Sequence, residues 1–455
     1  MTVERKPAVL RLAEWVVDLS ASDIPLSVRR CIRRCVIDTV GVAIAGSSTR
    51  VAQLAYRVAS DGGSNQFHAK AFGVPGRFAA KTAAFVNGAA AHALDFDDNC
   101  YAGFVHGSAV IVPAGFAVAQ DLDASGADLI TALVAGAECE YAIGAASKNV
   151  LYDQGWWTTG VLGPIGACAA VCRLLKLTVD QTASALGLAI VGAGGMKACF
   201  GSDGKALMAG RASESGVVCA LLAAEGARGP QNAIEGPNGF ISLFNGGEFD
   251  HSFLDALGSA WFLQVPGIDI KRIPVCLSSH AAADAVLELV ATHAIALHDI
   301  DRIICDVPPI VCKNLAYDRP MSVQQAQFSL PYAIATLLHF GEFGLQHLDL
   351  ALIQSDLLLG LMSRVSMHTG PMWNEPGLRT TAPEGASVAI HLRDGQVFKA
   401  FKAPAVGCAA DPLTEGQLDG KFLACTTPVM GDGPAHDLLT RLGTIDSGIS
   451  ARSLL

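Results

Sequence analysis

The chain has 455 residues, of which 51% are hydrophobic and 16% charged, a balance typical of a well-buried globular protein and not of a disordered one. One hydrophobic core rarely organises a chain of this length, so two domains are expected. The net charge of −10 provides no sequence-wide basic surface to neutralise phosphates, which argues against nucleic acid as a partner. Thirteen cysteines without a CxxC pair favour a reducing compartment over a disulfide framework.

Neither the N-terminus nor the longest uncharged stretch predicts a secretory or membrane segment. The start, MTVERKPAVLRLAEW, mixes charged and apolar residues without an uninterrupted apolar run, so we expect a cytoplasmic protein. Residues 99–120 contain no Asp, Glu, Lys or Arg and would be long enough to cross a bilayer. Because this stretch contains His106, Ser108 and Pro113, we predict a buried loop and helix there, and no membrane as a partner.

Helical spacing dominates the first part of the chain. After Asp23 and Pro25, apolar residues recur on one face of a predicted helix, while the arginine run at 29–34 occupies the other face, which we expect to be solvated. Similar spacing, with almost no strand signal, recurs at residues 79–94, 109–121, 128–147, 160–175, 180–192 and 206–225. Residues 1–266 are therefore predicted to form an all-helical domain.

The pattern then changes to a mixture of strands and helices. The predicted strands cover residues 302–307, 364–368, 388–392 and 397–401, and the predicted helices cover residues 280–294 and 324–339. Asp394 and Gly395 are a turn-forming pair, so the last two strands should form a hairpin. We therefore predict a mainly α fold: a large helical domain, a smaller α+β domain over 267–407, and helices in about 408–455 that complete the first domain.

The most polar segment of the apolar N-terminal half is HALDFDDN at 92–99, which is followed by His106. Its three carboxylates repel one another, and this costs stability unless they hold a cation, cap a helix or engage a substrate. A calcium loop fails, because Cys100 replaces the turn glycine and His106 stands where the closing glutamate should be. Capping of the following helix remains the structural alternative to a substrate site.

Two later polar segments contain cations that an anionic ligand would need. Lys205 follows two glycines in an apolar setting, where it could serve as a fixed cation for a carboxylate; an ordinary lysine at a helix start is the alternative. Residues 271–280, at the expected domain junction, combine two cations with hydroxyls and an imidazole, as in many ligand clefts. The structural alternative for residues 271–280 is a capped helix start with His280 in the first turn. Neither the GK at 204–205 nor the glycines at 192–195 complete a phosphate-binding motif.

These segments, in their order along the chain, resemble the MmgE/PrpD family, whose members include 2-methylcitrate dehydratase, cis-aconitate decarboxylase and iminodisuccinate epimerase. HALDFDD at 92–98 is the most specific part of a resemblance that covers nearly the whole chain. Its other parts are DTVG at 38–41, GVLGPIG at 160–166, Lys205 with AGR at 209–211, EGPNGF at 235–240 and FSLPY at 328–332. The resemblance implies a helical domain, a smaller α/β domain acting partly as a lid, a homodimer, and no cofactor.

Carried over residue by residue, the resemblance implies four catalytic residues: Asp95, His106, Lys205 and His280. We expect the substrate, a small polycarboxylic acid, to be bound by Asn99, Trp157, Lys271, Arg272 and Ser279. No metal ligand is expected. A proton next to a carboxylate is weakly acidic, so the site must supply a base and cations for the developing charge. His106 or His280 would be the base, and Lys205 its partner.

Two departures from the family pattern bear on the reaction. Gly155-Trp156-Trp157 has a tryptophan at the position of a usual histidine, and Met208 replaces a histidine often found three residues after the lysine. An epimerase needs only two proton-transfer groups on opposite faces, whereas a dehydratase also needs an acid for the leaving hydroxyl. We therefore expect an epimerase of the iminodisuccinate type. The alternatives are a hydro-lyase like 2-methylcitrate dehydratase, a carboxy-lyase like cis-aconitate decarboxylase, and a non-catalytic carboxylic-acid-binding protein.

Overall fold

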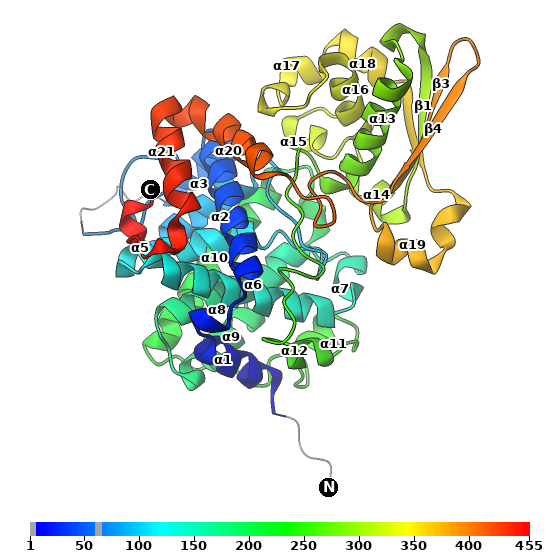
Figure 1. The fold of residues 1–455 in the computed structure, drawn as a ribbon. Coiled ribbons are helices and arrows are strands. Elements are labelled where there is room, and N and C mark those ends of the chain that lie inside the picture. Colours follow the sequence, from blue (N-terminus) through cyan, green and yellow to red (C-terminus); the bar gives the residue numbers. More distant parts are fainter. Residues whose placement is uncertain (1–5, 60–65) are drawn as a thin grey trace.

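The computed structural model describes residues 6–59 and 66–455, which form a large helical domain and a smaller domain built on a four-stranded sheet (Figure 1). This confirms the predicted mainly α fold with a smaller α+β domain. The helical domain contains α1 (Ala8–Asp18), α2 (Leu26–Gly46), α3 (Arg50–Ala59), α4 (Ala80–His92), α5 (Ser108–Leu122), α6 (Gly126–Ala146), α7 (Val150–Asp153), α8 (Thr158–Leu174), α9 (Val179–Val191), α10 (Asp203–Ala224), α11 (Phe240–Phe244) and α12 (Ser252–Asp255). The rest of the chain forms α13 (His280–His293), β1 (Ile300–Asp306), α14 (Pro309–Asn314), α15 (Val323–Ala326), α16 (Leu330–Phe340), α17 (Leu350–Ile353), α18 (Asp356–Met362), β2 (Val365–His368), α19 (Pro376–Thr381), β3 (Ala386–Leu392), β4 (Val397–Lys402), α20 (Glu415–Met430) and α21 (Asp432–Gly443).

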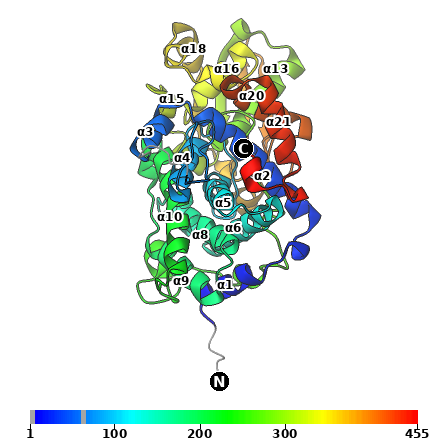
Figure 2. The same ribbon diagram turned by 90° about the vertical axis from the view of Figure 1, so that its left-hand side faces the viewer.

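The centre of the helical domain is formed by α4, α5, α6, α8 and α10 (Figure 2). Their buried faces are rich in Ala and Gly, so the helix backbones approach one another closely. Where α4 crosses α10, a Cβ added at Gly88 would lie only 3.0 Å from Gly210 Cα. This crossing positions two polar segments predicted to carry the site, because α4 ends at His92 and α10 begins at Asp203.

Replacing Gly210 by alanine should force α4 and α10 apart, because the added Cβ would overlap the backbone carbonyl oxygen of Phe85. Overpacking of this kind costs about 1–3 kcal/mol. We expect Gly210→Ala to unfold at a lower urea concentration than the wild type. Gly420→Ala is the control, since its Cβ would enter open space on α20 and should be neutral or slightly stabilising. Equal urea midpoints for the two variants would contradict this interpretation of the crossing.

The longest apolar helices are largely covered by the rest of the protein. By length and composition α6 and α10 could each cross a membrane, but their most apolar windows are 94% and 56% buried within the protein. The uncharged stretch 99–120 forms a largely buried loop and α5, as predicted.

The arginine run of α2 is solvated only in part: the Arg30 side chain is 62% exposed, as predicted, but those of Arg33 and Arg34 are only 30% and 15% exposed. α20 and α21 return to pack along α2 (Figure 1) and bring acceptors to it. Arg34 lies 2.7 Å from Glu415 Oε1 and donates to the Leu413 carbonyl at 2.6 Å. Arg33 lies 3.3 Å from Asp446. The local pattern could not reveal this contact, because Glu415 lies 381 residues further along the chain than Arg34.

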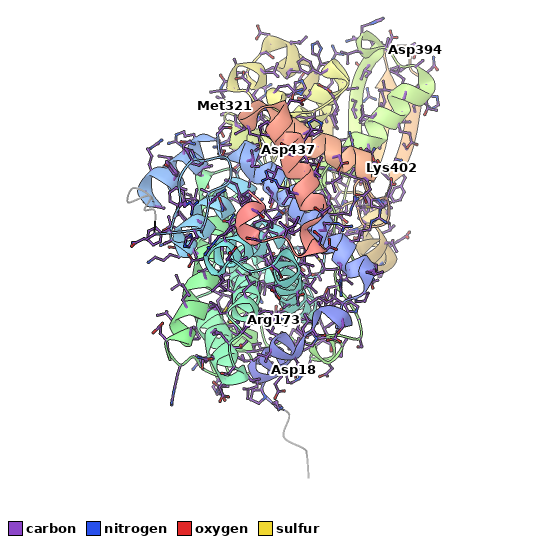
Figure 3. The ribbon with its side chains drawn as sticks, turned by 60° about the vertical axis from the view of Figure 1, so that its left-hand side comes forward. Asp18, Arg173, Met321, Asp394, Lys402 and Asp437 are labelled. Carbon is purple, nitrogen blue, oxygen red and sulfur yellow. The ribbon has the colours of Figure 1, made fainter. Side chains whose placement is uncertain are left out.

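The sheet of the smaller domain has the strand order β2-β1-β3-β4. β1 pairs in parallel with β2 and antiparallel with β3, and β3 and β4 form the predicted hairpin, in which Ala386 pairs with Lys402. α13 packs against the sheet. In Figure 3, Asp394 at the hairpin turn lies far from the helical domain, whereas Lys402 lies close to it. The residues just before β3 therefore face the helical domain.

The predicted helix over 324–339 is divided into α15 and α16. Ser329 caps the second helix by accepting from Tyr332 N at 3.2 Å, and Pro331 occupies its first turn. Proline starts a helix more readily than it continues one, because it lacks an N–H group. The break leaves Phe328 in a turn, from which it reaches the cavity described below.

The chain crosses between the two domains twice, and the crossings lie side by side. Ile270 N donates to the Gly407 carbonyl at 2.8 Å, and Ala409 N donates to Asp269 Oδ1 at 2.7 Å. Asn99 and Asp269 also exchange backbone hydrogen bonds of 2.9 Å each, which ties the first crossing to the loop after α4. The HALDFDDN segment therefore lies at the domain junction.

Candidate active site

A small cavity lies where the two domains meet. Its volume is about 30 Å³, which is about the volume of one water molecule in the liquid. The helical domain contributes Asn99, Phe104, His106, Tyr152, Trp157, Phe200 and Lys205 to its wall, and the smaller domain contributes Cys276, Leu277, Asn314, Phe328 and Glu384. The structure thus brings four of the predicted site residues to one cavity: Asn99, His106, Trp157 and Lys205.

Lys205 is held in the cavity wall by Asp95. It lies in the first turn of α10, which is capped by Ser202, and its Nζ forms an ion pair with Asp95 Oδ1. Lys271 is a second cation on the same carboxylate, with Nζ 3.3 Å from Asp95 Oδ2 and donating to the Asp95 carbonyl at 2.7 Å. Burial would raise the pKa of Asp95, but Lys205 and Lys271 together lower it well below its ordinary value. Two ammonium groups around one carboxylate leave this cluster with a net positive charge, which suits an anionic ligand.

His106 presents a free ring nitrogen to the cavity. Its Nδ1 lies 2.8 Å from the Asp98 carbonyl, which can only accept, so Nδ1 carries the proton and Nε2 keeps its lone pair. Burial lowers the pKa of His106 well below its ordinary value against the opposing effect of Asp97, and Lys205 and Lys271 lower it further. A neutral imidazole beside a cation can accept a proton from an acidic group bound in the cavity.

His92 and Asp97 pack next to His106 and are not part of the cavity wall. His92 Nδ1 lies 2.6 Å from Asp97 Oδ2, and His106 Nδ1 lies 3.6 Å from the same oxygen. Two histidines and a carboxylate can hold a metal ion, but two ligands of one ion, each bound at about 2.0–2.2 Å, lie about 3 Å apart or more. The 2.6 Å separation is that of a charge-assisted hydrogen bond. Trp157 stacks on His92 with ring centroids 5.4 Å apart, so the cluster is a packed support for His106.

Asn99 supplies an unused hydrogen-bond donor. It is only 6% exposed, it lines the cavity, and its Nδ2 has no hydrogen-bond partner among the residues that the structure describes. A buried polar group without a partner costs about 1–3 kcal/mol. A carboxylate oxygen of a ligand would remove this cost, so Asn99 and Lys205 together offer two donors to an anion.

Arg272 and Ser279, predicted to bind substrate, lie outside the wall of this cavity. Arg272 forms an ion pair with Asp284. Ser279 is fully buried, and within the described part of the chain its hydroxyl has no partner. The neighbouring Ser278 makes the contact to the cavity wall instead, by donating to Glu384.

His280 also lies outside the cavity wall. It is buried at the start of α13, with Nε2 3.4 Å from the Val275 carbonyl. Burial lowers the pKa of His280 well below its ordinary value, and Lys271 and Arg272 lower it further. The structure therefore does not bring His280 to the cavity shared by His106 and Lys205, and its catalytic role stays a prediction of the resemblance.

A chain of hydrogen bonds that the sequence did not reveal forms another part of the wall. Tyr152 OH donates to Asn314 Oδ1 at 3.0 Å, Asn314 Nδ2 donates to Ser278 Oγ at 3.0 Å, and Ser278 donates to Glu384 Oε1. Tyr101 OH donates to Glu384 Oε2 at 2.8 Å. Burial raises the pKa of Glu384, although Ser278 and Tyr101 oppose this effect. No local signal singled out Glu384, which lies four residues before the predicted strand over 388–392.

Cys276 lines the cavity but is not a thiolate nucleophile. Burial raises the pKa of its thiol to about 11, so the thiol is neutral near pH 7. The groups that can act on a ligand in this cavity are therefore a neutral imidazole, a cationic cluster, an amide donor and a buried carboxyl group.

Both parts of the chain match known family profiles. The MmgE/PrpD N-terminal domain matches residues 10–252, and the MmgE/PrpD C-terminal domain matches residues 273–440. The chain is 28% identical over 419 residues to cis-aconitate decarboxylase of Homo sapiens. This match covers 90% of this chain and 85% of the human protein. It is 26% identical over 443 residues to cis-aconitate decarboxylase-like protein oryM of Aspergillus oryzae. That match covers 92% of this chain and 90% of the relative. It is also 26% identical over 353 residues to cis-aconitate decarboxylase of Aspergillus terreus. That match covers 72% of this chain and 71% of the relative.

Proposed function

Because the chain belongs to the MmgE/PrpD family, we propose that it is a lyase that removes carbon dioxide from a small unsaturated polycarboxylic acid, with cis-aconitate as the first substrate to test. Two of the relatives named above are cis-aconitate decarboxylases and the third is a cis-aconitate decarboxylase-like protein, and they support a lyase over the epimerase expected from the sequence. The observation that carries the proposal is the placement of His106 and the Asp95-bound Lys205 on one cavity.

The cationic cluster suits the charge that this reaction develops. Loss of carbon dioxide from cis-aconitate leaves an electron pair that the adjacent double bond can carry toward a second carboxylate. A carbon of the former double bond then takes up one proton, so the trianion and one proton give carbon dioxide and a dianion with one carbon fewer. Lys205 and Asn99 would hold substrate carboxylates, and Lys271 would keep the Asp95 cluster cationic.

His106 would deliver the proton to carbon. The free site keeps its imidazole neutral, but a trianion bound next to it favours the imidazolium and so raises its pKa. His106 would take up a proton as the substrate binds and transfer it from Nε2. Asp97, 3.6 Å from Nδ1, would stabilise the imidazolium in the meantime.

The walls of the cavity would have to separate for substrate to bind, since a tricarboxylate does not fit into about 30 Å³. Wall residues come from both domains, and the two interdomain crossings lie side by side at Ile270 and Gly407. The smaller domain would therefore act as a lid that moves about these crossings.

Binding of tricarballylate, the saturated analogue of aconitate, should be accompanied by proton uptake at pH 7. His106 is neutral at this pH in the free protein because its pKa is lowered, and a bound trianion raises that pKa. The affinity should accordingly fall as the pH increases. Calorimetric titrations in buffers with different ionisation enthalpies measure the number of protons, and proton release on binding would contradict the expected state of His106.

The proposed function is tested by incubating the purified protein with cis-aconitate and measuring carbon dioxide release and the product by NMR. Iminodisuccinate and 2-methylcitrate are parallel substrates, followed by optical rotation and by ultraviolet absorbance of a new double bond. Prior exhaustive chelation should leave the rate unchanged, as expected for an enzyme without a cofactor. Turnover of 2-methylcitrate without any carbon dioxide from cis-aconitate would show that the chain is a hydro-lyase.

An epimerase of the iminodisuccinate type is the second candidate, and Trp157 favours it. This residue occupies the position of a usual family histidine, is 1% exposed and stacks on His92, so no titratable group is available there. Loss of optical rotation of chiral iminodisuccinate, with no carbon dioxide released from cis-aconitate, would favour the epimerase over the lyase.

A further inference from the structure

A second cavity, of about 720 Å³, lies between the two domains next to the catalytic cavity. Its rim includes Val265, which is 77% exposed, so this outer cavity opens to solvent. Three residues line both cavities: Phe104, Leu277 and Glu384. Of these three, Glu384 alone has a side chain that can carry a proton.

Glu384 has hydrogen-bonded contacts toward both domains. It lies in the turn between α19 and β3, at the end of the sheet that faces the helical domain. Ser278 donates to Oε1, and Tyr101, which lines the outer cavity, donates to Oε2 at 2.8 Å. Because a hydroxyl can donate or accept, Tyr101 remains a partner when Oε2 itself carries a proton. Glu384 as a whole residue is thus 8% exposed, but it lines both cavities.

We propose that Glu384 carries the proton that the reaction consumes from the outer cavity to His106. This inference rests on the proposed function, in which every turnover uses one proton inside a cavity with room for about one water molecule. The acid form of Glu384 gives its proton to His106 Nε2 across the catalytic cavity and becomes a carboxylate. His106 then protonates the substrate carbon as carbon dioxide leaves, and Glu384 regains a proton from the water of the outer cavity. The sum is one solvent proton incorporated per carbon dioxide released.

The electrostatic environment keeps Glu384 in its acid form above the ordinary range of a glutamate. Burial raises its pKa, against the opposing hydrogen bonds of Ser278 and Tyr101 and the charge of Lys271. The acid form is lost as the pH rises through this raised pKa, so kcat/KM should fall on the alkaline side. The titratable groups that face Glu384 are Tyr101, Tyr152, Lys197, Asp269, Lys271 and Cys276.

The Glu384→Gln variant tests the proposal without removing the hydrogen bonds. Its amide oxygen can accept from Ser278 and its NH₂ can donate to Tyr101, so the fold should be retained. We expect kcat on cis-aconitate to fall about 10- to 100-fold, less than the 10²- to 10⁴-fold typical of a group that acts directly on the substrate. The variant should lose the alkaline limb that Glu384 adds to kcat/KM and keep only the pH dependence that proton uptake by His106 imposes.

Asp250→Asn is the matched control, because Asp250 is a carboxyl group that lines the outer cavity but not the catalytic cavity and is not among the titratable groups that face Glu384. Its alkaline limb should match that of the wild type. A Glu384→Gln enzyme with wild-type kcat and an unchanged pH profile would overturn the proposal while leaving the proposed function intact. If the wild type releases no carbon dioxide, the proposed function has failed. Glu384 is then tested by deuterium exchange from heavy water into iminodisuccinate, and unchanged exchange in Glu384→Gln would overturn its role.

Discussion

The His106→Gln variant should lose about 10²- to 10⁴-fold in kcat, the usual contribution of a group that transfers a proton to or from the substrate. Glutamine retains a donor for the Asp98 carbonyl, now 2.8 Å from Nδ1, but has no group that titrates near neutral pH. The cationic cluster around Asp95 remains, so tricarballylate should still bind, but more weakly than to the wild type at pH 7, because the variant has no imidazolium next to the trianion. The proton uptake that accompanies its binding should be lost. Steady-state kinetics and calorimetry on one preparation measure both effects.

Two other histidines make this result specific. His298 is exposed, with 85% of its side chain accessible, and His298→Gln should behave as the wild type. His280→Gln tests the residue that the family resemblance adds to the site but that lies outside the cavity wall. An equal loss of kcat in His106→Gln and His298→Gln, or none in either, would exclude His106 as the proton-transfer group.

The Asp95→Asn variant should lower the free energy of unfolding by about 3–5 kcal/mol, the usual cost of leaving a buried charge without its partner. Lys205 and Lys271 are 5% and 0% exposed, and both depend on this carboxylate. Asparagine tolerates the left-handed backbone of residue 95, whose φ is 48°, so the loss would come from the charge and not from strain. Urea unfolding at pH 7 measures the change.

Glu14→Gln is the control for this measurement. The Glu14 carboxylate pairs with Lys6 at 2.6 Å, but the two side chains are 40% and 53% exposed. Exposed ion pairs contribute about 0–1 kcal/mol, so the control should unfold close to the wild type. If Asp95→Asn were as stable as Glu14→Gln, the two buried lysines would not depend on Asp95 for their charge balance.

Local periodicity predicted the parts of the fold that depend on neighbouring residues. The helices α4, α5, α6, α8, α9 and α10 each begin and end within three residues of their predicted ranges, and the β3–β4 hairpin was found from its turn pair. Asp95, His106 and Lys205 could be singled out because charged groups interrupted otherwise apolar sequence. The structure brings His106 and Lys205 to one cavity, with Asp95 bonded to Lys205.

The features that the sequence did not predict depend on contacts between distant segments of the chain. Glu384 stands between Pro383 and Gly385, which is typical of an exposed turn, and its burial comes from Tyr101, 283 residues earlier in the chain. Arg33 and Arg34 of α2 were assigned to solvent because their acceptors belong to the C-terminal segment. No local pattern contains this information, since the same residues would be exposed if the distant segments that cover them were absent.

The return of α20 and α21 to α2 has a consequence for how the protein acquires its fold in the cell. Arg30 of α2 and its partner Glu415 are separated by 385 residues, so the ribosome makes one of them long before the other. At about 5–20 residues per second the interval is roughly 20–80 seconds. During this time the whole smaller domain is synthesised while the face of α2 that later meets α20 is uncovered. The nascent helical domain cannot be completed before the smaller domain has emerged, and protection of α2 by a chaperone would be most useful in that interval.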